Sequence, residues 1–111
     1  MTNTTIHARP PAWALLEKAI TERKSVRVTY HGHRRVLCPH LLGWHNDRAK
    51  LLSYQASGTT STGALTSDHR HRWRAMFVDE IEDPAITDQP WQTAPNYTPH
   101  VIGIDSIELA V

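Results

Sequence analysis

The sequence contains a single cysteine, Cys38, so the chain cannot form an internal disulfide bond. It has no apolar run long enough to span a membrane. Its first ten residues, MTNTTIHARP, lack the apolar centre of a signal peptide. We therefore expect a soluble protein of the cytoplasm with no membrane partner.

Lysine and arginine are absent after Arg74. All twelve basic residues precede Ala75, whereas seven of the eleven acidic residues follow it. This asymmetry predicts a polar molecule with a basic surface that attracts anions. Alternatively, the basic and acidic parts neutralise each other by packing together.

The composition is typical of one small globular domain. Of the 111 residues, 40% are apolar, which is enough for a modest core. We expect residues 1–10 to be flexible and residues 11–111 to form the domain. Within it, we predict a helix over 11–24, a barrel over 25–86 and a packed extension over 87–111.

A change of periodicity separates the helix from the sheet. Apolar side chains recur at helical spacing from Trp13 to Ile20, after two prolines that suit a helix start. From Val26 the pattern alternates with period two, and His31-Gly32 suits a tight turn. Pairing across this turn places Arg35 on the apolar face, where an arginine needs an anionic partner or a barrel mouth.

The remaining segments predict further strands. We expect strands over 49–55 and 69–81 and near Ile107, with a flexible loop over 56–68. Alternation in the second of these strands predicts one face shared by Arg70, Arg72, Arg74, Met76 and Val78. One helix followed by about five short antiparallel strands implies a mainly β fold, a small and strongly bent β-barrel.

An ordered set of short motifs runs through residues 15–86. An R-x-L-x-P strand is followed by a Leu-Gly step, a turn that ends in arginine, and RWRAMFVDEIEDPAI. The residues on these motifs are Arg35, Leu37, Pro39, Leu42, Gly43, Arg48, Arg74, Met76, Val78, Asp79, Ile81, Glu82 and Asp83. In this order the motifs resemble the WYL-domain family, with Ala49-Lys50-Leu51 standing at the family's Trp-Tyr-Leu.

The resemblance implies an Sm-like barrel, which is a Src-homology-3-like fold. It implies a regulatory or ligand-sensing module whose basic pocket binds nucleic acids or nucleotide-like ligands in bacterial or phage proteins. Because only eleven residues precede Ala12, we expect a divergent, stand-alone member without a helix-turn-helix.

Histidines and the cysteine are candidates for metal binding or catalysis. Histidines occur at 31, 33, 40, 45, 69 and 71, but no spacing matches a zinc pattern, so we expect polar surface side chains. Cys38 and His40 share a strand face without an oxyanion element or an acidic partner, and a free cysteine is usually a buried small hydrophobe. We predict no catalytic residue, no metal and no cofactor.

The best candidate site is made of three arginines and two aromatic rings: Arg35, Arg72, Arg74, Trp44 and Tyr54. The guanidinium groups offer forked donors for phosphate or carboxylate oxygens, and the rings offer faces on which a base stacks. Alternatively, the arginines pair with the acidic stretch 79–83 or are solvated. The other large rings, Trp13, Trp73, Trp91 and Tyr97, are predicted to anchor the core and the tail.

The sequence therefore predicts a non-catalytic module that binds an anionic ligand, with single-stranded nucleic acid or a nucleotide as first choice. The alternative is a protein-interaction module, with a protein partner or a homo-oligomer formed through exposed strand edges.

Overall fold

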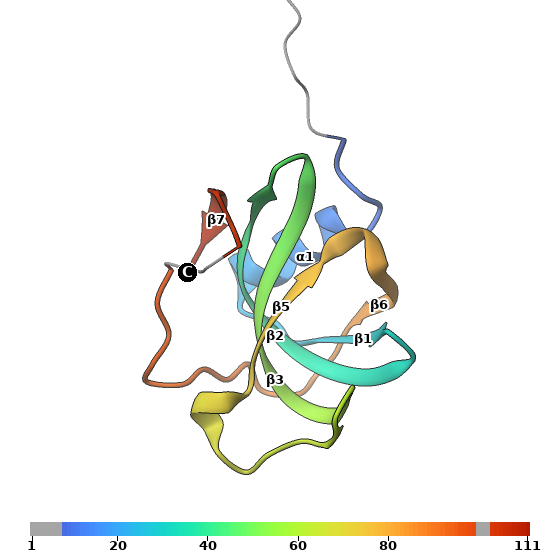
Figure 1. Ribbon diagram of the computed structural model, residues 1–111, viewed down its shortest axis with the longest axis vertical. Helices are drawn as coiled ribbons and strands as arrows, with labels where there is room; N and C mark the ends of the chain where they lie inside the picture. The colour runs from blue at the N-terminus through green and yellow to red at the C-terminus, as the bar shows by residue number, and fades with distance from the viewer. Residues whose placement is uncertain (1–7, 100–102) are drawn as a thin grey trace, which may run out of the picture.

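The computed structural model describes residues 8–99 and 103–111. Within them it shows a mainly β architecture, in which one α-helix packs on a curled antiparallel sheet that forms a half-barrel (Figure 1). The elements are α1 (Trp13–Glu22), β1 (Val26–Tyr30), β2 (His33–His45), β3 (Arg48–Thr60), β4 (Gly63–Ala64), η1 (His69–His71), β5 (Trp73–Phe77), η2 (Val78–Glu80), β6 (Ile81–Ile86) and β7 (Ser106–Ala110).

The predicted helix is confirmed, with slightly shorter bounds. It buries one face, formed by Trp13, Leu16, Ala19 and Ile20. The residue after the helix, Arg23, adopts a left-handed conformation (φ 51°), which glycine usually supplies at this position. The backbone amides of Arg23 and Lys24 close the last turn by donating to carbonyl oxygens of the helix. Within the described part of the chain, no helix is long and apolar enough to cross a membrane.

The register of the first hairpin is also confirmed. β1 pairs with β2 so that Tyr30 lies opposite His33 and Val28 lies opposite Arg35. Val28 is 1% exposed and Arg35 is 4% exposed. The period-two pattern therefore places an arginine inside the sheet, as the sequence predicted.

The sheet curls because its central strands are long and irregular. β2 and β3 pair along most of their lengths, with register shifts between Val36 and Leu37 and between Pro39 and Leu41. Such bulges bend a strand and increase its twist. β5 pairs with β3, and η2 then carries the chain to β6, which pairs with β1 at the other side of the sheet (Figure 1).

The C-terminal part of the chain runs around the outside of the sheet and places β7 beside β2 (Figure 1). A Cβ atom at Gly43 would lie 2.3 Å from the carbonyl oxygen of Ser106, so only glycine permits this close approach. Trp91 Nε1 donates a hydrogen bond to the carbonyl oxygen of Pro39, and Tyr97 Oη donates one to that of Val111. These rings anchor the segment, as predicted, and the predicted strand near Ile107 is β7.

The segment between β3 and β6 differs from the prediction. Part of the expected loop over 56–68 is regular, because β3 continues to Thr60 and pairs with β4. The expected strand over 69–81 is reduced to β5, since Asp68 caps η1 by accepting a hydrogen bond from the backbone of Arg70. Arg72 therefore ends η1 and does not alternate with Arg74 along one strand.

Helix docking gives a direct test of this core. Leu16 is fully buried beneath α1, whereas the neighbouring Leu15 is only partly buried. We expect Leu16→Ala to lower the free energy of unfolding by about 2–5 kcal/mol, because it removes buried methyl groups and leaves a cavity. Leu15→Ala is the matched control and should cost clearly less in urea unfolding. Equal losses would contradict the described helix face.

Candidate anion-binding pocket

Two of the predicted arginines lie in one pocket of about 390 Å³. Arg35 comes from β2 and Arg74 from β5. The rest of the pocket includes a wall of hydroxyl side chains, called here the hydroxyl wall: Thr60, Ser61, Thr62 and Thr66. We call the whole cavity the Arg35–Arg74 pocket.

Local backbone geometry builds this pocket. Arg35 lies opposite Gly58 on β3, where a Cβ atom would be 2.2 Å from the carbonyl oxygen of Arg34. Glycine also permits the positive φ of 102° at this position. Beyond it, Thr60 Oγ1 donates to the carbonyl oxygen of Gly63 and accepts from the amide of Thr62, which fixes the hairpin that carries the hydroxyl wall.

The guanidinium group of Arg35 is buried, but it makes only part of the hydrogen bonds that it can donate. Its Nη2 donates a long hydrogen bond of 3.4 Å to the carbonyl oxygen of Tyr30, and its guanidinium lies 5.4 Å from the centre of the Tyr30 ring. Its Nε is buried and has no hydrogen-bond partner. A buried donor without a partner costs about 1–3 kcal/mol, and more when the group is charged.

Arg74 is held by neutral groups. Its Nε donates to Gln55 Oε1 at 3.2 Å, and its Nη1 donates to the carbonyl oxygens of His71 and Trp73, both at 2.9 Å. Its Nη2 makes no hydrogen bond with the described residues. Burial, and then the charge of Arg74, lower the pKa of Arg35; burial, and then the charge of Arg72, lower the pKa of Arg74. The positive charges of the pocket therefore repel one another, and no carboxylate is among its described lining residues.

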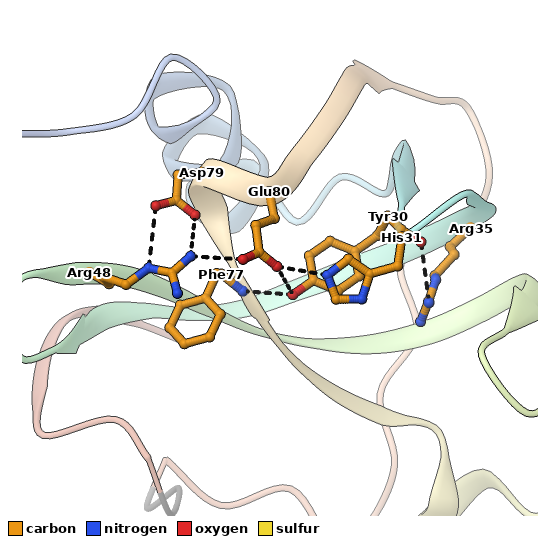
Figure 2. Close-up of polar contacts among 7 residues, drawn as sticks. All are labelled: Tyr30, His31, Arg35, Arg48, Phe77, Asp79 and Glu80. Atoms are coloured by element: carbon orange, nitrogen blue, oxygen red, sulfur yellow. Dashed lines mark hydrogen bonds and ion pairs between the residues drawn. The ribbon is translucent and has the colours of Figure 1, made fainter.

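The acidic stretch 79–83 does not supply that compensation (Figure 2). Asp79 and Glu80 both pair with Arg48, at 2.7 and 2.9 Å. Glu80 also bonds to His31 at 2.7 Å, and hydrogen bonds, first from His31 and then from Arg48, lower the pKa of Glu80 to about 2.

The alternative prediction, in which the candidate arginines pair with this stretch, is therefore wrong for the described residues. The ion pairs of this part of the chain include none with Arg35, Arg72 or Arg74. Asp68, beside the pocket rim, pairs with Arg70 and His71.

The structure does not bring the other three predicted site residues into the pocket. Arg72 lies beside it, where its Nε donates to the carbonyl oxygen of Thr66 at 2.7 Å. Trp44 is 4% exposed and stacks on Trp13 with ring centres 5.0 Å apart. Tyr54 is fully buried and bonds through its hydroxyl to His69. These placements correct the expectation that the two rings present open faces, because core packing covers both.

Sequence reasoning missed the hydroxyl wall, which it assigned to a flexible loop. The run TTST at 59–62 carried the signal, because hydroxyl donors close to arginines are what a phosphate or carboxylate needs.

The histidines do not all lie at the surface. His40 is fully buried, stacks on Trp91 at 4.3 Å and donates from Nδ1 to the carbonyl oxygen of Cys38 at 2.6 Å. Its Nε2 then accepts from Thr93 Oγ1 at 2.8 Å. The expectation of a surface side chain is wrong for His40, because the rings of the C-terminal segment cover it. Burial lowers the pKa of His40 to about 4, so the imidazole is neutral at pH 7.

Cys38 lies beside His40 but is not paired with it. Its sulfur accepts a hydrogen bond from the amide of Gln92, and burial raises the pKa of the thiol. A buried neutral thiol is a poor nucleophile. No group of three or more metal-ligating side chains comes together within residues 8–99 and 103–111.

Comparison with known proteins identifies no relative. No protein-family model matches the chain, and neither a curated protein nor a solved structure matches it significantly.

The buried imidazole predicts a pH dependence of stability. The pKa of His40 is depressed from 6.5 to about 4 in the folded protein, so the unfolded chain binds the proton more tightly. Neutral His40 therefore contributes up to about 3 kcal/mol to the free energy of unfolding above pH 6.5, and this contribution is lost as the pH falls towards 4. Urea unfolding of His40→Gln should show a weaker fall over this range than the parent. His33→Gln, which changes a half-exposed histidine, should keep the parental slope. Parallel curves for His40→Gln and the parent would contradict the assignment.

Proposed function

We propose that this chain is a non-catalytic regulatory module that binds a phosphate-bearing ligand, single-stranded nucleic acid or a nucleotide, in the Arg35–Arg74 pocket. The observation that carries the proposal is the buried Nε of Arg35, which has no partner. A bound phosphate would place negative charge beside this incompletely bonded guanidinium and offset the repulsion between the two arginines.

The resemblance of the sequence motifs to the WYL-domain family supports the same proposal. Under it, the curled sheet is an Sm-like barrel, Arg35 stands on the arginine of the first strand motif, and Arg74 stands on the first arginine of the last motif. The proposal differs from the sequence-based hypothesis in the groups that hold the ligand. The hydroxyl wall replaces the rings of Trp44 and Tyr54, so phosphate contacts rather than base stacking supply the affinity.

Binding to a labelled single-stranded oligonucleotide, followed by fluorescence anisotropy, tests this function. We expect Arg74→Gln to weaken binding about ten- to a hundredfold and to reduce the slope of log affinity against log salt by about one, because one charged phosphate contact is lost. Arg34→Gln is the matched control, since Arg34 is the exposed neighbour of Arg35 on β2. It should change affinity much less. Unchanged binding by Arg74→Gln would contradict the site.

Arg35→Met separates a functional charge from a structural one. Replacing a buried charge by an apolar side chain of similar length is often neutral or stabilising. We therefore expect this variant to lose binding while its free energy of unfolding, measured without ligand, stays the same or rises. A large loss of stability would instead assign Arg35 a structural role.

A second candidate function is self-association, favoured by the exposure of Ile107 on β7. This side chain is 48% exposed on a strand that pairs with β2 alone among the described strands, so a second copy could add at its other edge. Sedimentation should then show a mass that rises with protein concentration and falls back to the monomer in Ile107→Lys. A monomeric parent at all concentrations would exclude it.

A further inference from the structure

The Arg35–Arg74 pocket distinguishes between kinds of phosphate, first by charge. Two guanidinium groups line it, and no carboxylate lies among its described lining residues. An internal phosphodiester carries one negative charge, whereas a terminal phosphate carries about −1.5 to −2 at pH 7. Only the terminal group comes close to neutralising both arginines.

The number of donors points the same way. Within the described residues, Nε of Arg35, Nη2 of Arg74 and the hydroxyl of Ser61 donate no hydrogen bond, whereas the hydroxyl of Thr60 donates to Gly63. A terminal phosphate presents three oxygens that are free of ester bonds, whereas a phosphodiester presents two. The terminal group can therefore satisfy more of these donors at once.

Access to Arg35 is the third constraint. Because this residue lines the pocket and is 4% exposed, a ligand contacts its guanidinium only by entering the pocket, not by lying across the surface. A terminal phosphate enters on one ester linkage. An internal phosphate would have to bring two linkages, and the strand on both sides, through the same opening.

The lining residues also indicate that the pocket does not recognise the base of a nucleotide. Its described lining holds no tryptophan, tyrosine or phenylalanine, and its aromatic ring is the small imidazole of His71, whose side chain is 74% exposed. The volume of about 390 Å³ lies at the lower end of the range for small-molecule sites and leaves room for the sugar next to the phosphate. Recognition would therefore depend on the end of the ligand and not on the identity of its base.

We propose that the Arg35–Arg74 pocket is an end-binding site, which takes the terminal phosphate of a nucleotide or of a single strand and discriminates against internal phosphates. This inference rests on the proposed function and specifies its ligand. The chemistry shared by both sources is a phosphate monoester attached to a sugar.

The test compares oligonucleotides of one sequence that differ only at their ends: 5′-hydroxyl, 5′-phosphate and 3′-phosphate. A 5′-hydroxyl strand longer by one nucleotide controls for the extra charge. We expect anisotropy to show at least tenfold tighter binding for one of the phosphorylated strands than for both hydroxyl strands. Arg74→Gln should reduce this preference, and Arg34→Gln should retain it. Competition with a nucleoside monophosphate identifies the source: displacement at similar concentrations assigns a free nucleotide, and displacement only by the phosphorylated strand assigns a strand end.

The other outcomes overturn the inference in distinguishable ways. If all strands bind equally and Arg35→Met abolishes the binding, the pocket binds internal phosphates and the end-binding proposal is wrong, although the proposed function stands. If no strand and no nucleotide binds at low salt, both the end-binding proposal and the proposed function fail.

Discussion

The enclosed charge of Arg35 is the constraint on which the pocket depends. Pairing of β1 with β2 directs this side chain to the inner face, opposite Val28, and the absence of a side chain at Gly58 lets β3 pass close to the backbone of Arg34 and Arg35. The β3–β4 hairpin then brings hydroxyl groups, and not carboxylates, to the same cavity. A charge in such surroundings is costly unless a ligand completes its hydrogen bonds, which is typical of a binding residue and not of a stabilising one.

The parts of this arrangement that follow from local pattern were predictable from the sequence. Alternation in SVRVTY and a turn at His31-Gly32 determine which residues face each other, because a shift of one residue would reverse every side chain. The buried position of Arg35 follows directly. The buried face of the helix, which ends at Ile20, was equally predictable, since the spacing of its residues depends only on the helical period.

The parts that depend on contacts distant in sequence were not predictable. Alternation assigns a side chain to a face of the sheet but does not say what covers that face. Trp44 is covered by Trp13 of α1, and His40 by Trp91, which lies about fifty residues further along the chain. The pattern also could not show that Asp68 caps a 3₁₀ turn, which delays the start of β5 and moves Arg72 out of register.

The uneven distribution of charge along the chain has two structural outcomes. Acids of the C-terminal half neutralise cations of the N-terminal half at the surface: Glu108 pairs with Arg9, and Asp79 and Glu80 both pair with Arg48. The prediction of mutual neutralisation therefore holds at these positions. It fails at the Arg35–Arg74 pocket, because none of the described residues that line it is acidic. A net charge of +1 thus conceals a local excess of positive charge, and that excess is enclosed where a small anion is better able to reach it than a protein carboxylate.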